Sequence, residues 1–256
     1  MQNPRILLLT RKFPPSFGGV QNYYKNLLLN LRTTKLTVLT AAEKDCEHVD
    51  QLFEKAGVRI FRSEFIPENM GLSPRFQWFH WLIKFIKKVT NINKEQQIDY
   101  LLVGQARMFM LMTVFFIKLI KKKPYLLYLH GEEIPQIPLK SDFLSKYFYK
   151  KASGYLCNSH FTEQRLKKYL QSDSLKTSVI TPGVEDKFFQ HQAHDDIRSA
   201  LGINGKSVIY TIARLDERKG QDMMIKALSI IKKRFPDVIY LIGGIGPRME
   251  FLKNLV

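Results

Sequence analysis

The sequence is poor in cysteine and lacks long apolar runs. Its 256 residues include two cysteines, Cys46 and Cys157, and no Cys-x-x-Cys pair, which excludes a disulfide scaffold and a thiolate zinc site. So few cysteines indicate a reducing compartment. The longest apolar stretch, Met108–Ile117, has ten residues, whereas a membrane-spanning helix needs about 20. We therefore expect no such helix, and the apolar run at the N-terminus is too short for a signal peptide core.

Several catalytic motifs are also missing. The chain has neither a G-x-G-x-x-G fingerprint nor a Walker loop, so dinucleotide binding and P-loop hydrolysis are not supported. It has no G-x-S-x-G elbow, and Cys157 lies in a strand-like run without an implied partner, so nucleophilic catalysis finds no support. The histidines show no metal-ligand spacing. His191 and His194, beside two aspartates, are interpreted as surface residues.

Positive charge is the anomaly of the composition. The 40 lysines and arginines outnumber the 23 acidic residues, for a formal charge of +17, which suits nucleic acid, an anionic lipid surface or the phosphates of a nucleotide. The excess is partly regional, because between Arg75 and Lys123 the acidic residues are Glu95 and Asp99 alone. These cations are either solvated helix faces or a docking surface. Nucleic acid is not expected as a partner, since helix-turn-helix and stacked-aromatic signals are absent.

Short β-rich runs alternate with helical patterns along the chain. Several runs are continuously apolar, as in strands that are covered on both faces. We predict strands at residues 6–10, 36–40, 58–62, 100–104, 125–131, 154–159 and 178–181. Helical spacing predicts helices after Gly18-Gly19, around Trp78–Val89, over 107–120 and over 160–170. This alternation is typical of βαβ units, so the predicted class is α/β with a parallel sheet.

The pattern changes near Gly183. Residues 186–205 are polar and broken by glycine, which predicts a junction. A new βαβ unit follows, with strands expected at 207–215 and 238–244, a helix between them and the start of a second helix over 247–256. Two strands and two helices cannot cover both faces of a sheet. We therefore expect a complete N-terminal domain over 1–185 and, over 206–256, the beginning of a second domain.

Two glycine pairs lie where a strand is expected to meet a helix. Gly18 and Gly19 follow Pro14-Pro15, and backbone N–H groups at a helix N-terminus suit a phosphate. Gly244 and Gly246 occupy a similar turn in IGGIGP, at the end of a strand where open α/β sheets bind ligands. Both pairs can equally serve tight turns, and the residues alone leave the two explanations open.

Three side chains are candidates for chemistry at these strand ends. Arg214 and Lys219 follow the first strand of the second unit and can hold phosphate oxygens. The alternative is that they pair with Asp216 and Glu217 nearby. His130 ends the strand in YLLYLHGEE and can bind a substrate or transfer a proton. A solitary histidine is also commonly structural.

Six segments, taken in chain order, carry a resemblance to a known family: PPSFGGVQNYYKNL, YLHGEE, CNSHFTEQRL, VITPGVEDKFF, IARLDERKGQDMMIKAL and IGGIGPRMEFL. Together they resemble the retaining glycosyltransferases of family four. The resemblance implies the GT-B fold, in which two Rossmann-like domains, acceptor-side and donor-side, face each other across a cleft. It also implies transfer of a hexose, with retention, from a UDP- or GDP-sugar to a glycan or lipid-linked acceptor in surface polysaccharide or glycolipid synthesis.

The resemblance further implies roles for the candidate residues. His130 would lie near the transferred sugar. Arg214 and Lys219 would stabilise the departing diphosphate, as a metal does in other transferases, so neither a metal nor another cofactor is expected. The glycines would bring the backbone close to the substrates: Gly18 and Gly19 to the donor's diphosphate or the acceptor, Gly244 and Gly246 to the nucleotide.

One departure from the family pattern bears on activity. Family members carry, further downstream, a Glu-x-seven-Glu element that contacts the donor sugar and the ribose, and this chain ends at Val256 before it. We therefore expect a truncated gene product, an expressed fragment or a split protein. The alternative function is a catalytically incomplete module that binds an acceptor or a partner.

The implied location is cytoplasmic, with a possible peripheral position on the inner face of the cytoplasmic membrane. The regional basic surface and the helix that carries Trp78, Trp81 and Phe85 would suit docking on anionic lipid. Packing in the core is the plainer interpretation of these three aromatic residues.

Overall fold

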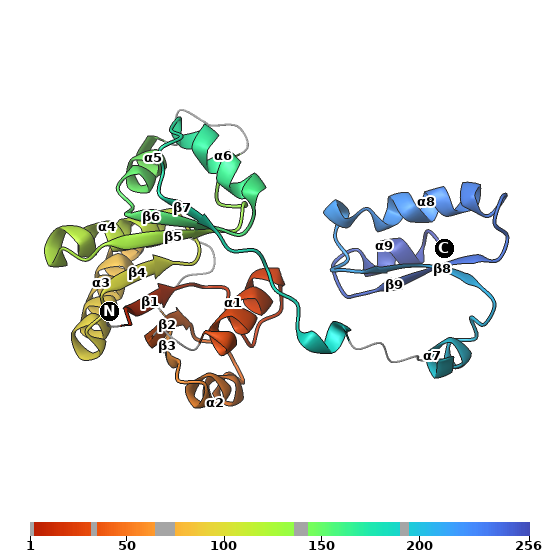
Figure 1. Ribbon diagram of the computed structural model, residues 1–256, viewed down its shortest axis with the longest axis horizontal. Coiled ribbons are helices and arrows are strands. Elements are labelled where there is room, and N and C mark those ends of the chain that lie inside the picture. Colours follow the sequence, from red (N-terminus) through yellow and green to blue (C-terminus); the bar gives the residue numbers. More distant parts are fainter. Residues whose placement is uncertain (1–2, 32–34, 65–74, 136–142, 190–194) are drawn as a thin grey trace. The chain divides into compact units, whose positions relative to one another are not determined.

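The structure, a computed structural model, describes residues 3–31, 35–64, 75–135, 143–189 and 195–256. The chain divides into two compact units, Met1–Val184 and Glu185–Val256 (Figure 1). The junction expected at 186–205 falls in the second unit. It contains the 3₁₀ turn η2, Asp186–Phe189, and helix α7, Asp195–Ala200. Residues 190–194, with His191 and His194, lie outside the described residues.

The first unit is built on a sheet of seven parallel strands. Their order is β3-β2-β1-β4-β5-β6-β7, and the bounds are β1 Arg5–Leu9, β2 Lys35–Ala41, β3 Arg59–Ser63, β4 Tyr100–Val103, β5 Tyr125–Leu129, β6 Gly154–Cys157 and β7 Thr177–Val179. All seven strands were predicted within two residues of these bounds. The order reverses between β1 and β4. Open α/β sheets bind ligands at such a switch point, beyond the carboxyl ends of the strands.

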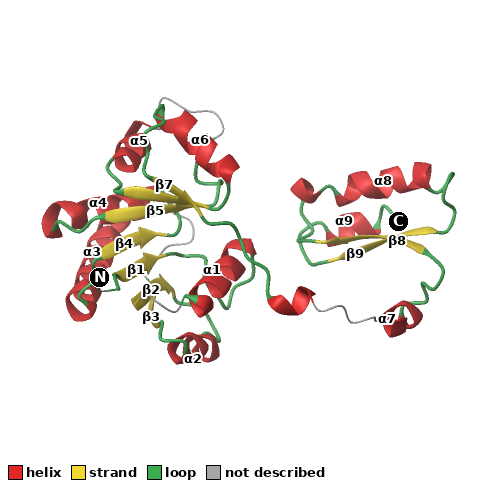
Figure 2. Cartoon of the chain, in the orientation of Figure 1, coloured by secondary structure: helices red, strands yellow, loops and turns green. Residues whose placement is uncertain are grey.

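Helices cover both faces of this sheet (Figure 2). The larger core cluster places α3 Arg75–Gln96, α4 Met108–Lys121, α5 Phe143–Lys150 and α6 His160–Leu170 on one face. The second cluster places α1 Gly19–Asn30 and α2 Glu47–Lys55 on the other face. The helices α1, α3, α4 and α6 were predicted from the sequence, whereas α2 and α5 were not.

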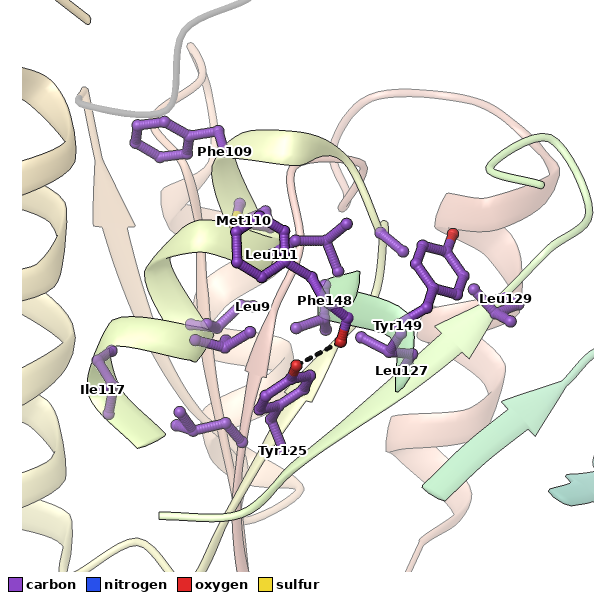
Figure 3. Packing of buried hydrophobic residues seen from close by; sticks show 14 of the residues in the cluster. Leu9, Phe109, Met110, Leu111, Ile117, Tyr125, Leu127, Leu129, Phe148 and Tyr149 are labelled. Atoms are coloured by element: carbon purple, nitrogen blue, oxygen red, sulfur yellow. Dashed lines mark hydrogen bonds between the residues drawn. The ribbon is translucent and has the colours of Figure 1, made fainter. Parts of the chain in front are cut away.

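Strand β5 shows how the two faces of the sheet are filled and toward which face the residue after the strand points. Tyr125, Leu127 and Leu129 pack into the larger cluster (Figure 3), while Tyr128 belongs to the cluster under α1. The buried Tyr125 hydroxyl donates a hydrogen bond of 2.5 Å to the carbonyl oxygen of Phe148, which satisfies a polar group inside the apolar layer. Because side chains alternate along a strand, His130 follows Tyr128 toward the α1 face.

The aromatic stripe of α3 belongs to the core, as the plainer interpretation held. Phe85 is fully buried, and Trp78 and Trp81 are half-buried against the same cluster. None of the helices in the described ranges combines the length and the hydropathy that a bilayer crossing requires. Both cysteines are free thiols.

The second unit contains the predicted βαβ arrangement. Parallel strands β8, Ser207–Ile212, and β9, Val238–Gly243, pair along their whole length. Helix α8, Gln221–Ile231, connects them, and α9, Met249–Lys253, follows. Part of its apolar surface is exposed, including Tyr210 and Ile212 on β8.

Candidate functional site

The carboxyl ends of β1, β4 and β5 meet at the switch point of the first sheet. The buried side chain of Gln105, just after β4, ties two of these ends together. Its Oε1 accepts hydrogen bonds of 3.3 Å from the backbone N–H groups of Arg11 and Lys12, just after β1. The loop from β1 then runs through the cis peptide bond between Pro14 and Pro15 to the start of α1.

The two predicted glycines at the start of α1 differ in their surroundings. A Cβ atom at Gly18 would lie 2.4 Å from Oε1 of Gln21, and the Gln21 side chain is itself held by a hydrogen bond to Ser16 Oγ. A side chain at Gly18 would therefore have to displace the Gln21 side chain. A Cβ atom at Gly19 would meet nothing within 4 Å, so the packing of this unit leaves open space there.

His130 lies directly after β5 and is enclosed by aromatic rings. The ring of Tyr128 stacks on it at 5.0 Å between centroids, and Tyr23 and Tyr24 of α1 meet it edge-on at 5.6 and 5.4 Å. Its Nε2 lies 2.9 Å from the Tyr24 hydroxyl. Its backbone N–H donates to Glu133 Oε2 at 3.0 Å. The sequence identified His130, but not the tyrosine cage, because contacts between α1 and β5 are tertiary.

Burial controls the protonation of this cluster. Desolvation, followed by the nearby charge of Lys12, lowers the pKa of His130 to about 4, so the ring is neutral at pH 7. Burial also raises the pKa of Glu133. Lys12 pairs with Glu132 at 3.4 Å. A neutral imidazole of such low basicity is suited to accept or donate a hydrogen bond rather than to carry charge.

A pocket of about 410 Å³ opens beside His130. It is formed by the loop after β5, the end of β6 and the first turn of α6. Arg165 of α6 binds the carbonyl oxygens of Gly131 and Ile134, which fixes the loop after His130. Ser159 caps α6 by accepting from the backbone N–H of Thr162 at 3.1 Å. The other lining residues include Glu132, Pro135, Asn158 and Phe161.

In the second unit, Arg214 and Lys219 are exposed cations that follow the end of β8. The alternative pairing with Asp216 is not observed. Asp216 instead caps the turn η3, Glu217–Lys219, by accepting from the backbone N–H of Arg218, whose guanidinium lies 3.8 Å away. Within the described ranges, neither the Arg214 nor the Lys219 side chain has a hydrogen bond or an ion pair.

The turn that holds these cations is fastened to α8. Nε2 of the buried Gln221, the first residue of α8, donates to the carbonyl oxygen of Arg214 at 3.2 Å. Two cations on an ordered strand-to-helix turn, without an ion pair in the described part of the chain, can bind a polyphosphate.

Gly244 and Gly246 lie at the end of β9, where their backbone touches the turn after β8. A Cβ atom would lie 1.9 Å from the carbonyl oxygen of Ala213 at Gly244, and 2.4 Å from that of Leu215 at Gly246. Gly244 also has a φ of +151°. Both glycines are therefore required for this close approach, whatever they do toward a ligand. In the described part of the chain, no three His, Cys, Asp or Glu residues form a cluster that could hold a metal.

A family model described as Glycosyltransferase Family 4 matches residues 17–188, more than half of the chain. The chain belongs to this family. A second model, described as Glycosyl transferases group 1, matches residues 193–256.

Two curated relatives match nearly the whole chain at modest identity. The GDP-mannose-dependent alpha-(1-6)-phosphatidylinositol monomannoside mannosyltransferase of Mycolicibacterium smegmatis is 27% identical, over 98% of this chain and 63% of its own length. The GDP-mannose-dependent monoacylated alpha-(1-6)-phosphatidylinositol monomannoside mannosyltransferase of Corynebacterium glutamicum is 25% identical, over 98% of this chain and 64% of its own length. The chain thus spans less than two thirds of the length of these relatives.

Solved structures support the fold. Anabaena HepE, crystallised with UDP and glucose, has a TM-score of 0.69 at 19% identity and covers 99% of this chain and 65% of its own. A glycosyltransferase from Rickettsia africae has a TM-score of 0.71 at 18% identity, and the match covers 99% of this chain and 64% of that one. Together with the parallel sheet of seven strands, these likenesses confirm the predicted α/β, GT-B-like fold class.

Proposed function

We propose that this chain transfers a hexose, with retention of configuration, from a GDP- or UDP-sugar to a lipid-linked or glycan acceptor. The observation that carries the proposal is the pair of exposed cations at the end of β8, Arg214 and Lys219, whose side chains have no partner among the described residues, in a chain of this family. The relatives named as GDP-mannose-dependent mannosyltransferases favour a GDP-sugar as donor and a glycolipid as acceptor.

In this proposal, the second unit binds the donor nucleotide and the first unit binds the acceptor. The bond between the sugar C1 and the diphosphate oxygen breaks, and its electron pair leaves with the diphosphate. Arg214 and Lys219 stabilise the growing negative charge without a metal. The acceptor hydroxyl attacks C1 from the face that the diphosphate leaves, and its proton passes to the leaving oxygen. Configuration at C1 is thereby retained.

The roles of the remaining candidates follow from their positions. We assign His130 to the transferred sugar, because it lines the pocket beside β5. Gly19, with open space around it, and Gly18 present the backbone of the α1 N-terminus to the diphosphate or the acceptor. Gly244 and Gly246 carry the nucleotide at the end of β9.

The test is transfer by the purified chain. It is incubated with GDP-mannose or UDP-glucose and a phosphatidylinositol mannoside acceptor, and the product is examined by mass spectrometry and NMR. We expect an α-linked product from an α-linked donor, and activity that falls at least tenfold in Arg214→Ala but not in Lys233→Ala, an exposed cation beyond the opposite end of α8. A β-linked product would contradict retention. A folded chain that transfers neither sugar would reject the proposal in favour of the binding module.

A membrane surface is part of the proposal. Helices α3 and α4 pack against each other, and their outer surfaces expose Phe79 and Ile83 on α3 and Leu119 and Ile120 on α4. Exposed lysines lie on the same two helices: Lys87 follows Ile83 by four residues on α3, and Lys121 follows Ile120 at the end of α4. This combination suits the cytoplasmic face of an anionic bilayer.

Vesicle sedimentation tests the membrane surface. The chain should bind phosphatidylglycerol vesicles, with weaker binding at higher salt. The double reversal of Lys87 and Lys121 to glutamate should abolish most of the binding, whereas the matched reversal of Lys232 and Lys233 in the second unit should not. Equal losses in both double variants would show that net charge alone is responsible.

A further inference from the structure

The hydroxyl group of Tyr24 lies between a backbone carbonyl and the His130 ring. Tyr24 is fully buried in α1. Its hydroxyl donates a hydrogen bond of 2.8 Å to the carbonyl oxygen of Gly104. The same oxygen lies 2.9 Å from Nε2 of His130.

Counting protons decides the direction of the second bond. A phenol has one hydrogen, and a carbonyl oxygen can only accept. The Tyr24 hydrogen therefore belongs to the Gly104 carbonyl, and the hydrogen bond to His130 must be donated by Nε2–H. A neutral imidazole carries one ring hydrogen, so Nδ1 is then an unprotonated acceptor.

The surroundings keep the ring neutral. Tyr23, Tyr24 and Tyr128 enclose it, and burial is the main cause of its lowered pKa. The charged groups that act on it are Lys12, which disfavours protonation, and Glu132, which favours it less strongly. Glu133 is occupied by the backbone N–H of His130.

We propose that Tyr24 is a positioning residue that holds His130 as the neutral Nε2–H tautomer and so leaves Nδ1 to accept a hydrogen bond from a hydroxyl group of a bound sugar. Among the described residues, the Nδ1 atom has no hydrogen-bond partner, and His130 lines the pocket beside β5. The identity of the ligand rests on the proposed function, whereas the tautomer does not. His130 then recognises the sugar and does not act as an acid or base at neutral pH.

The backbone around Tyr24 is shaped for this contact. A Cβ atom at Gly104 would lie 2.5 Å from the Tyr24 hydroxyl oxygen and 3.0 Å from Cβ of Thr10. Glycine at the end of β4 therefore lets the hydroxyl reach the carbonyl that takes its hydrogen. The neighbouring Tyr23 hydroxyl donates instead to the carbonyl oxygen of Ile180, which makes Tyr23→Phe a matched control.

Long-range ¹H–¹⁵N NMR of the ¹⁵N-labelled chain at pH 7.5 tests the tautomer, with His130→Gln used to assign the resonances. We expect a protonated Nε2 and an unprotonated Nδ1 in the wild type and in Tyr23→Phe. In Tyr24→Phe, the buried Nε2–H loses its acceptor, so the Nδ1–H tautomer should become populated. An Nδ1–H tautomer in the wild type would overturn the proposal, and this test requires no variant. A tautomer that is unchanged in Tyr24→Phe would remove the role of Tyr24.

The ligand is tested separately by titration with GDP-mannose, UDP-glucose and the free nucleotides. A sugar nucleotide should shift the Nδ1 resonance, and the free nucleotide should not. In Tyr24→Phe, affinity for the sugar nucleotide should approach that for the free nucleotide. If Nδ1 does not respond to either sugar nucleotide, the sugar assignment is wrong. The tautomer is decided by the spectra recorded without ligand, whereas the sugar contact is decided by the titration. Failure of the tautomer proposal can therefore be distinguished from failure of the proposed function.

Discussion

The neutral state of His130 predicts a loss of stability in mild acid. The unfolded chain takes up a proton near the ordinary histidine pKa of 6.5, whereas the folded protein does so only near a pKa of about 4. The free energy of unfolding is therefore unaffected by His130 protonation above pH 6.5 and decreases as the pH falls toward 4. At pH 5, this difference destabilises the first unit by about 2 kcal/mol relative to pH 7.5.

Urea unfolding followed by tryptophan fluorescence measures this effect in the first unit alone. Both tryptophans of the chain, Trp78 and Trp81, lie on α3. The reference is His130→Gln, which has no titratable ring, so the shifted pKa values of Glu133 and Glu163 contribute equally to both proteins. We expect the wild type to lose about 2 kcal/mol more than the variant between pH 7.5 and pH 5. Parallel pH profiles of the two proteins would refute the buried neutral histidine.

Further substitutions, one in each unit together with a control, test the packing. Gly244→Ala places a Cβ atom 1.9 Å from the Ala213 carbonyl oxygen and should destabilise the second unit by about 2–3 kcal/mol. Faster hydrogen exchange in β8 and β9 would report this loss. Gly19→Ala, with free space around Cβ, should not destabilise the first unit, in which it lies. Arg62→Ala removes a guanidinium that binds the Asp50 carboxylate and two backbone carbonyls and should cost the first unit about 2–4 kcal/mol. A cost below about 0.5 kcal/mol would show that this ion pair behaves as an exposed one.

The sheet could be predicted because its strands are apolar runs bounded by polar turns. Strand β5, for example, reads YLLYL and is found at Tyr125–Leu129. Helix α2 escaped prediction because its nine residues, EHVDQLFEK, offer one buried side chain, Phe53. Helix α5 is also short, with Phe148 and Tyr149 buried. Such short helices form through packing on the sheet rather than through a sustained pattern.

The candidate site was only partly visible in the sequence. The positions of strand ends and glycines predicted His130 and the turn that holds Arg214 and Lys219 as candidates. The spacing could not show that Asp216 turns toward Arg218, because capping depends on local backbone geometry. Tyr24 lies in the helix predicted after Gly18-Gly19, and the helical spacing does not distinguish it from its neighbours. Its hydroxyl contacts join segments that are 80 and 106 residues away, a relation that no local pattern contains.

The central claim is that the turn after β8 binds a nucleotide diphosphate. The direct measurement is calorimetric titration of the purified chain with GDP, UDP and their sugar conjugates. Charge-assisted hydrogen bonds to a phosphate contribute about 1.5–3 kcal/mol each, so Arg214→Ala and Lys219→Ala should each weaken binding about tenfold or more, while Lys233→Ala should bind as the wild type does. Saturable binding that is unaffected by both substitutions, or the absence of binding to any nucleotide by a folded chain, would contradict the claim.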